Sequence, residues 1–374
     1  MELSLCFCIA AALGSIFTVL WSLSEGHRVG PGAAALIGTS ACFMVPPGVC
    51  GGVLLILSFI LLTCVTKTKV QLLPTKDRAV LVTGCDSGFG LALVKQLSGL
   101  GLTVFAGVLD VNGSGAQQLR EQGSEKLQVV QLDVTDSAQI ETVHHYIRTQ
   151  VSDTGLWGLV NNAGVLGSPA DAELQPIAVY RRCMDVNFLS AVKMSQVFLP
   201  LLRRSRGRIV NVSSLAGDVP LPMFAAYGAS KAALSIFSRV MRLELSAWGV
   251  HVSLIQPAGF RTNLFGNADD VARFRDEILA SVCSEAREDY GTAYIMSLPS
   301  SLSKMSGDCA EDLSPVVDAM CHALMSPRPR SLYAPGQMGW LLPFLHRHFP
   351  AFVFDAAITS LIKHDVCPAG LSRS

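Results

Sequence analysis

Past Gln71, short apolar runs alternate with longer stretches that have the length of helices. The apolar runs are continuous, as in strands that helices cover on both faces, and they lie at 79–83, 103–109, 127–132, 158–162, 208–214 and 251–256. The stretches between them predict helices at about 88–100, 137–151, 177–204 and 224–248. Strands that alternate with helices form βαβ units, so we predict an α/β fold with a doubly wound parallel sheet. A seventh, short strand is expected at 331–334.

The alternation weakens past Gly259, where the chain predicts helices and loops with many small residues. We interpret about 260–312 as a helical C-terminal substrate lid, with Tyr290 and Tyr294 as candidates to order it. The lid would belong to the same domain as the sheet, which then covers 71–335.

The tail at 336–374 is a third part, apolar and aromatic in composition. Its segment WLLPFLHRHFPAFVFDAAITSLI places Arg347 and histidines between the rings. Such a segment could pack as a further layer over the sheet or touch a membrane, and the sequence leaves both open.

The first 70 residues have the pattern of a membrane anchor. No charged residue occurs at 3–23 or at 29–66, and a bilayer core needs about 20 apolar residues per helix. We predict one span at about 3–23 and one or two more at 31–65. A cleaved signal peptide is the alternative for the first span, but its charged n-region is missing. Positive residues tend to stay cytoplasmic, which favours a cytosolic catalytic domain because basic residues follow the last span at Lys67, Lys69, Lys76 and Arg78.

Composition excludes some classes of protein. Hydrophobic residues make up 50% of the chain and charged residues 16%, and the leader accounts for the excess apolarity. Basic and acidic residues both number 29, so the basic surface of a nucleic-acid-binding protein is not expected. The 11 cysteines show no CxxC pair, which favours reduced thiols over a disulfide framework, and we predict no metal site.

The run TGCDSGFG at 83–90 stands between the first strand and its helix, where a phosphate-binding loop belongs. Glycines there allow a tight turn and a close approach of the backbone, and the helix N-terminus attracts phosphate. We predict that this loop holds a nucleotide through Gly84, Ser87, Gly88, Phe89 and Gly90.

The end of the second strand should meet the adenosine ribose. Asp110 lies there and could bind the ribose hydroxyls or simply start the turn. Neither this strand end nor the 85–89 loop carries an Arg or Lys that could hold a 2′-phosphate, so we predict NAD rather than NADP as the cofactor.

Tyr227 and Lys231 lie four residues apart on a predicted helix, so both project from one face. Ser214 ends the fifth strand, thirteen residues earlier, at the sheet edge that carries ligands. The chain also carries the motifs TGCDSGFG (83–90), NNAG (161–164), NVSS (211–214) and YGASK (227–231). Through these residues and motifs, the chain resembles the short-chain dehydrogenase/reductase family over roughly residues 75–265. The resemblance implies a Rossmann fold and a catalytic set of Tyr227, Lys231, Ser214 and Asn187.

The resemblance implies a role for each member of this set. Tyr227 would take the hydroxyl proton of an alcohol as its hydride passes to NAD, and Lys231 would bind ribose and lower the phenol pKa from about 10. Ser214 would hold the substrate oxygen. Asn187 would keep a relay water, or alternatively brace a helix as a buried amide.

The resemblance also implies further cofactor contacts. Asp133 would hydrogen-bond the adenine, although it could instead be a plain helix N-cap. Thr262 would meet the carboxamide or the pyrophosphate, although Ala258 replaces the glycine that the family usually has nearby. The remaining expected contacts are Val134, Asn161 and Ala163.

The substrate is less strongly indicated. The leader together with GLWGLVNNAGVLG, VMRLELSAWGV and EDYGTAYI resembles the 17β-hydroxysteroid dehydrogenases of microsomal membranes. Other segments, among them RPRSLYAPGQ, are as similar to 11β-hydroxysteroid dehydrogenases, and the glycine loop is similar to microsomal retinol dehydrogenases. We therefore expect a membrane enzyme of the endoplasmic reticulum that oxidises a steroid, with the 17β-hydroxyl ranked first. By resemblance it would be a homodimer, and the remaining alternative is a nucleotide-binding scaffold without catalysis.

Overall fold

A computed structural model describes residues 72–122, 124–266, 268–361 and 366–372. The predicted membrane spans at 3–23 and 31–65 lie outside these residues. Among the helices that the structure describes, none has the length and apolarity needed to cross a membrane. Leu73–Met325 and Ser331–Ser374 form one compact unit.

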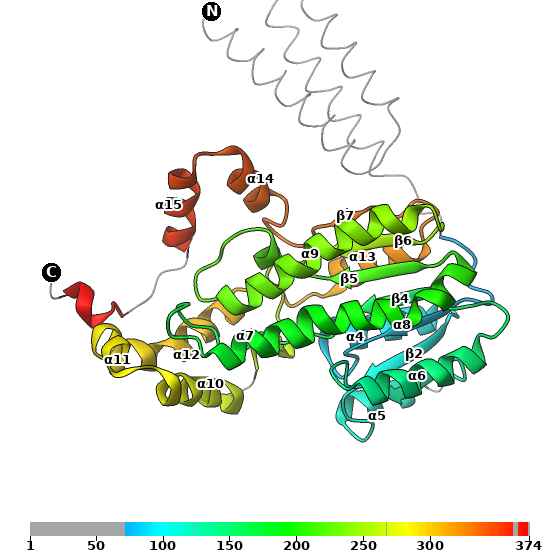
Figure 1. Cartoon of the computed structure of the whole chain (residues 1–374), viewed down its shortest axis with the longest axis horizontal. Coiled ribbons are helices and arrows are strands. Elements are labelled where there is room, and N and C mark those ends of the chain that lie inside the picture. The colour runs from blue at the N-terminus through cyan, green and yellow to red at the C-terminus, as the bar shows by residue number, and fades with distance from the viewer. Residues whose placement is uncertain (1–71, 123, 267, 362–365, 373–374) are drawn as a thin grey trace, which may run out of the picture. The chain divides into compact units, whose positions relative to one another are not determined.

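The centre of this unit is a seven-stranded parallel sheet in the order β3-β2-β1-β4-β5-β6-β7 (Figure 1). The strands are β1 (Ala79–Val82), β2 (Thr103–Val108), β3 (Leu127–Gln131), β4 (Gly158–Asn161), β5 (Arg208–Val212), β6 (His251–Ile255) and β7 (Leu332–Tyr333). The predicted doubly wound parallel sheet is confirmed, with each strand inside its predicted range. Because the chain winds outward from β1 in one direction and from β4 in the other, the topological switch point lies between these two strands.

Helices cover both faces of the sheet. One face carries α4 (Gly88–Gly99), α5 (Ser114–Arg120) and α13 (Ser314–Met325), and the other carries α6 (Ser137–Gln150), α8 (Ser190–Ser205) and α9 (Ala225–Ser246). Alternate residues of one strand point to opposite faces, so Val80 and Val82 join the first core and Ala79 and Leu81 join the second. Both faces are apolar, which explains the continuous apolar runs in the sequence.

The helix predicted at 177–204 is not continuous. It consists of α7 (Ile177–Met184), a π-helical turn (Asp185–Leu189) and α8. Asn187 lies in the π-helical turn, and single π-turns inside α-helices are frequent at functional sites. The sequence interpretation also missed two elements, the short helix α5 and helix α13.

The chain after β6 is mostly helical. A 3-10 turn (Asn263–Phe265) leads into three helices, α10 (Ala268–Ser281), α11 (Ser284–Tyr290) and α12 (Thr292–Gly307). Tyr294 Oη donates to Asp171 Oδ2 at 2.6 Å, and Tyr290 Oη donates to Glu173 Oε2 at 3.2 Å. These bonds tie α11 and α12 to the segment after β4. The tail forms α14 (Leu341–His348) and α15 (Ala351–Leu361), followed by a 3-10 turn (Ala369–Ser372).

Candidate active site

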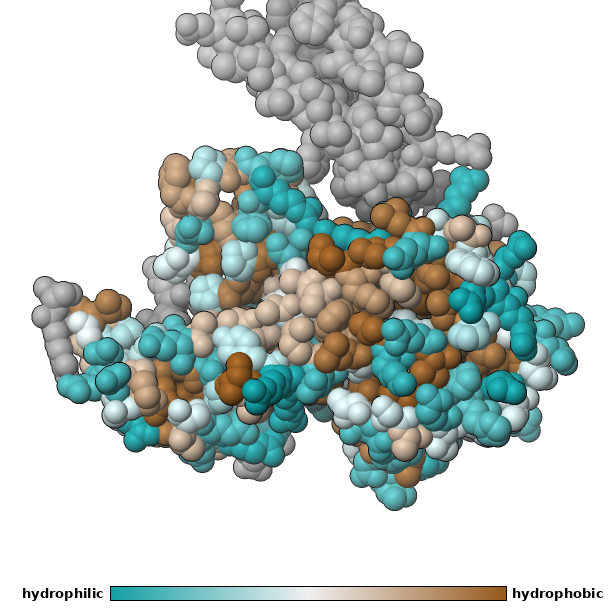
Figure 2. Space-filling view, in the orientation of Figure 1, coloured by the Kyte–Doolittle hydropathy of each residue, from teal (hydrophilic) through white to brown (hydrophobic). Residues whose placement is uncertain are grey.

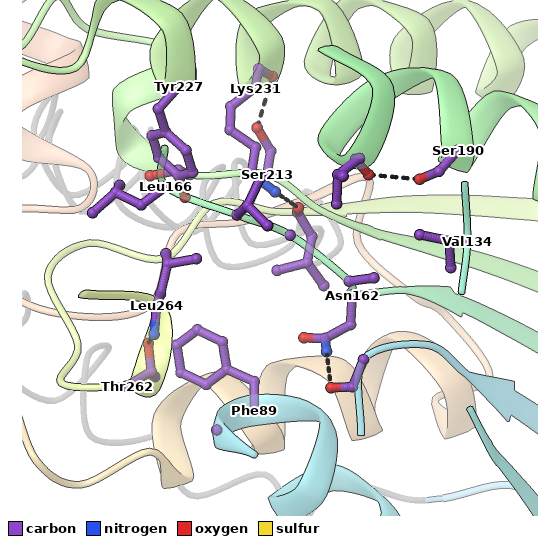
Figure 3. A pocket seen from close by; sticks show the side chains of 18 of the residues that line it. Phe89, Val134, Asn162, Leu166, Ser190, Ser213, Tyr227, Lys231, Thr262 and Leu264 are labelled. Carbon is purple, nitrogen blue, oxygen red and sulfur yellow. Dashed lines mark hydrogen bonds between the residues drawn. The ribbon is translucent and has the colours of Figure 1, made fainter. Parts of the chain in front are cut away.

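A cavity of about 1150 Å³ opens at the carboxyl ends of the central strands. Its walls come from the glycine loop after β1, from the chain after β3, β4, β5 and β6, and from the first turns of α9. Figure 3 shows Phe89 and Thr262 on one wall, with Tyr227 and Lys231 across from them on α9. This is where ligands bind in open parallel sheets.

The glycine loop has the backbone that a phosphate site requires. Gly84 and Gly88 have φ angles of +68° and +56°, which side chains with a Cβ rarely adopt. A Cβ on Gly90 would lie 2.2 Å from the carbonyl oxygen of Gly84, so only glycine fits there. Ser87 is the N-cap of α4 and makes no side-chain cap. The first amides of α4 are therefore available to an anion, and Gly84, Ser87, Gly88 and Phe89 line the cavity.

Asp86 is a site residue that the sequence interpretation missed. Its carboxylate accepts hydrogen bonds from the backbone N–H of Leu109, at 2.9 Å, and of Asp110, at 3.3 Å, and it lines the cavity at the end of β2. The Asp110 carboxylate instead accepts from the N–H of Asn112 at 2.8 Å, and Asp110 is not among the lining residues. Of the two interpretations of Asp110, the start of a turn agrees with the structure. The acidic residue inside the loop was the signal for Asp86, but only the fold brings it to β2.

Asp133 and Val134 line the cavity beyond the end of β3. The carboxylate of Asp133 accepts from the backbone N–H of Thr135 at 2.8 Å. The N-cap of α6 is Asp136, whose side chain accepts from Ala138 and Gln139. The interpretation of Asp133 as a plain N-cap is therefore wrong. Its contact with adenine stays a prediction.

Asn161 does not reach the cavity. Its side chain is buried, and Nδ2 donates to Asn211 Oδ1 at 2.8 Å, across the β4–β5 pair. The next residue, Asn162, lines the cavity and donates to the carbonyl oxygens of Thr83 and Gly84, at 2.9 and 3.1 Å. Asn162, and not Asn161 as expected, is thus the asparagine that faces the cavity. Asn162 holds the glycine loop in place, and Ala163 lines the cavity.

Tyr227 and Ser214 meet on the cavity wall. Ser214 follows β5 in an extended conformation, and its hydroxyl accepts from the Ala216 N–H at 3.2 Å. Tyr227 lies in the first turn of α9, where burial raises its pKa to about 12 and the nearby Ser214 hydroxyl acts in the opposite direction. The phenol is therefore neutral near pH 7, and the expected lowering of its pKa is not found in the protein alone.

Lys231 lies one turn further along α9, with its Nζ 5.7 Å from the ring centre of Tyr227. The ammonium donates to the carbonyl oxygen of Val212 at 2.8 Å. Burial lowers the pKa of Lys231 to about 8, so the amine is still protonated in most molecules at neutral pH. At the cavity wall, desolvation therefore disfavours the charged forms of both the Tyr227 phenol and the Lys231 amine.

Asn187 is buried, and its amide is fully engaged. Nδ2 donates to the Val165 carbonyl and to Ser230 Oγ, both at 2.9 Å, and Oδ1 accepts from the Val165 N–H at 2.8 Å. These bonds join the π-turn to α9 and to the chain after β4. They support the bracing interpretation of Asn187, which does not line the cavity. Through Val165, Asn187 also holds the neighbouring Gly164 in place. Gly164 lies close to Lys231, since a Cβ on it would be 3.3 Å from Lys231 Nζ.

Two further predicted residues behave differently. Thr262 lines the cavity beside the glycine loop, where a Cβ on Gly88 would lie 3.4 Å from it, and it caps the 3-10 turn through its hydroxyl, which accepts from Leu264 N–H at 3.4 Å. Gly90 does not line the cavity, since it packs against the backbone of Gly84. Ala258 donates its N–H to Pro335 O at 3.0 Å, so this unusual position is tied to the chain after β7.

The cavity has two chemically distinct ends. Near Tyr227 it is lined by apolar side chains, and in Figure 3 Leu166 and Leu264 lie beside the phenol, away from Val134 and Ser190. The other apolar residues at this end are Leu221, Phe224, Phe265 and Met305. Across the described residues, no cluster of His, Cys, Asp or Glu is arranged to hold a metal ion. The arrangement suits proton transfer at an apolar alcohol next to a bound nucleotide.

Comparisons with known proteins agree with this geometry. Residues 78–272 match the family model described as short chain dehydrogenase. Estradiol 17-beta-dehydrogenase 2 of Mus musculus is 42% identical over 356 residues, which is 95% of this chain and 93% of the relative. The 11-beta-hydroxysteroid dehydrogenase type 2 of Ovis aries is 47% identical over 282 residues, 75% of this chain and 66% of the relative. A crystal structure of a short chain dehydrogenase/reductase from Burkholderia phymatum in complex with NAD has a TM-score of 0.60 at 22% identity, and it covers 74% of this chain and 94% of its own.

Proposed function

This chain belongs to the short-chain dehydrogenase family and is an oxidoreductase, and we propose that it oxidises a 17β-hydroxysteroid to the 17-ketosteroid with NAD as the hydride acceptor. One observation carries the proposal: Ser214 and Tyr227 line the apolar end of the cavity together, with the Lys231 ammonium 5.7 Å from the ring centre of Tyr227. A relative that matches 95% of the chain is an estradiol 17-beta-dehydrogenase, which supports the choice of substrate.

The reaction separates a hydride and a proton from one carbinol. Ser214 holds the substrate hydroxyl, and Tyr227 takes its proton as the C–H bond breaks and the ketone forms. Lys231 stabilises the phenolate through its positive charge, because an opposite charge nearby favours the ionised form. Bound NAD would supply the hydride acceptor and a positive nicotinamide. The residues that would hold it are those of the glycine loop, Asp133, Val134 and Thr262, which line the cavity.

The Asp86 carboxylate supports NAD over NADP. It lies at the end of β2, where the ribose of the adenosine binds in this fold, and a 2′-phosphate there would meet a negative charge. Asp86→Asn keeps an oxygen acceptor for Leu109 but removes the charge. We expect the preference for NAD over NADP, as a ratio of kcat/KM, to fall at least tenfold, about 1.4 kcal/mol.

Asp110→Asn is the matched control, because that carboxylate caps a turn and does not line the cavity. An Asp110 variant that changes cofactor preference as strongly as the Asp86 variant would reject this assignment.

A specific observation favours a second substrate. The sheep 11-beta-hydroxysteroid dehydrogenase type 2 has the higher identity, 47%, although over a shorter part of the chain. A panel with NAD separates the candidates: estradiol, testosterone, cortisol and retinol, each incubated with membranes that contain the full-length chain. We expect estradiol and testosterone to be oxidised with the highest kcat/KM. Membranes with Tyr227→Phe give the background, and cortisol turnover above estradiol turnover would assign the enzyme to the 11β-hydroxyl instead.

Residues 1–70 are proposed to anchor the enzyme in the endoplasmic reticulum membrane, where a lipophilic steroid partitions. The support is the absence of charge over 3–23 and 29–66. The full-length chain should stay in the membrane pellet after an alkaline carbonate wash. Its release into the wash would contradict a spanning anchor.

The α10–α12 segment is proposed to act as the substrate lid. Its 3-10 turn and the end of α12 contribute Leu264, Phe265 and Met305 to the apolar end of the cavity. The hydrogen bond from Ser168 Oγ to Glu277 Oε2, 2.9 Å, attaches α10 to the chain after β4.

A homodimer is proposed through α8 and α9. Ile236, Val240 and Leu243 form an exposed apolar stripe on α9, with 58, 46 and 65% of each side chain exposed. Figure 2 shows this apolar surface in brown tones along α9. Light scattering of the detergent-solubilised protein should give twice the chain mass, and Leu243→Glu should lower it to one chain.

A further inference from the structure

The tail helices α14 and α15 have two different sides. On the inner side Leu342, Phe354 and Ile358 are buried and pack in one cluster with Leu215 and Val219, the residues that follow Ser214. The outer side carries six exposed apolar residues, which we call the tail patch: Met338, Trp340, Phe344, Phe349, Phe352 and Val353, exposed by 43, 50, 46, 45, 73 and 38%. The inner contacts already fix both helices, so the exposure of the outer side is not due to loose packing.

Two rings of the tail patch, those of Phe344 and Phe349, lie next to each other. Phe344 follows Trp340 by one helical turn, and its N–H donates to the Trp340 carbonyl at 3.1 Å. The ring of Phe344 lies 4.7 Å from His348 and 6.4 Å from Phe349, measured between ring centres. Tryptophan is enriched at the boundary between the headgroups and the acyl chains of a bilayer, and phenylalanine is typical of the apolar face of helices that lie in this layer.

The tail helices pack against residues that line the apolar end of the cavity. Leu215, Leu221 and Ala258 line the cavity and also contact the tail cluster. A surface in contact with lipid at this place would lie next to the apolar half of the cavity.

We propose that the tail patch rests in the interfacial layer of a lipid bilayer, as an in-plane contact that is separate from the N-terminal leader. Two observations select lipid over a protein partner. The first 71 residues lie outside the described structure and contain uncharged runs at 3–23 and 29–66, which would hold the enzyme at a membrane. The guanidinium of Arg347, in α14, is turned toward Asp218 with a 2.6 Å hydrogen bond, so this charge is paired with a carboxylate, and all six residues of the tail patch are apolar.

Tryptophan fluorescence tests the proposal in the full-length protein. Vesicles are prepared from phosphatidylcholine with and without bromine on the acyl chains near the headgroups, because bromine quenches only tryptophans that touch the lipid. Trp340→Phe removes one of the four tryptophans and keeps an aromatic ring. We expect the quenched fluorescence to fall by the emission of one tryptophan in this variant.

Trp248→Phe is the matched control. Trp248 is 58% exposed, against 50% for Trp340, but it lies beyond the end of α9 and outside the patch. Its removal should leave the quenched fluorescence unchanged, and the signal from the leader residue Trp21 is common to all variants. Equal quenching in the wild type and in Trp340→Phe would overturn the proposal and would show that water, the leader or a second copy covers the patch. The measurement needs no turnover, so its outcome is independent of the proposed reaction.

Discussion

Replacing Lys231 with methionine should stabilise the protein at neutral pH while it abolishes oxidation. The side chain is buried, and burial lowers its pKa from the ordinary value of 10.5 to about 8. The folded state thus binds this proton more weakly than the unfolded state does. The charge therefore destabilises the fold fully below the folded pKa, and this effect fades as the pH rises toward the unfolded value.

The size of the effect follows from the two pKa values. One pKa unit corresponds to about 1.4 kcal/mol, so the buried charge costs about 3 kcal/mol near pH 7. The bond from Lys231 Nζ to Val212 O, 2.8 Å, offsets part of this, about 1 kcal/mol. We expect Lys231→Met to gain about 2 kcal/mol in the free energy of unfolding near pH 7. By about pH 9.5 the wild type has lost about 2 kcal/mol of this penalty, so the advantage of the variant should vanish.

Urea unfolding of the full-length protein, followed by tryptophan fluorescence at both pH values, measures this difference. Lys126→Met is the matched control, because the exposed Lys126 also donates to a backbone carbonyl, that of Gly101 at 3.1 Å. It should change the free energy of unfolding by no more than about 0.5 kcal/mol at either pH. A Lys231→Met protein that is less stable than the wild type near pH 7, or whose gain does not depend on pH, would refute the reasoning.

Three further variants test other parts of the site. Tyr227→Phe should lower kcat by roughly 10³-fold and leave the NAD-dependent thermal shift intact, since only the proton acceptor is lost; near-normal turnover would contradict its role. Gly90→Ala should lose about 1–3 kcal/mol and most of its NAD affinity, because the new Cβ would lie 2.2 Å from a backbone oxygen of the loop. Gly99→Ala on the same helix meets nothing within 4 Å and should be neutral or stabilising in the same melting assay. Tyr294→Phe removes the 2.6 Å bond to Asp171 and should cost about 1–3 kcal/mol, with faster proteolysis of α10–α12 as the readout; unchanged proteolysis would mean that this bond does not hold the segment.

The sheet was predictable because each strand is covered on both faces. A strand such as β1, Ala-Val-Leu-Val with all four residues buried, must then be apolar at consecutive positions, and such a run is visible in the sequence without knowledge of its neighbours. The π-turn at Asp185–Leu189 was not visible in this way. It is accompanied by hydrogen bonds between Asn187 and Val165, which is 22 residues away, and helical periodicity carries no information about such a pair.

The site shows the same division. The tyrosine, the lysine and the serine are read from their spacing, because a helix face and a strand end fix where they point. Asn161 and Asn162 are adjacent, and alternation along β4 decides which of them faces the cavity. The end of the strand was predicted correctly, but the face on which each asparagine lies was not. Asp86 needed the fold itself, since its partners Leu109 and Asp110 follow β2, a different strand from the one that precedes Asp86.

Burial of the two reactive groups determines when the phenol can act as a base. The pKa of Tyr227 is raised to about 12 and that of Lys231 is lowered to about 8, so desolvation opposes the charged form of each. Ser214 favours the phenolate, but less strongly than burial opposes it. A further positive charge beside the phenol would shift the balance, and in the proposed reaction the oxidised nicotinamide carries that charge whereas the reduced one does not. The phenolate is then favoured before hydride transfer and the phenol after it, so one tyrosine can act as base in oxidation and as acid in the reverse reaction.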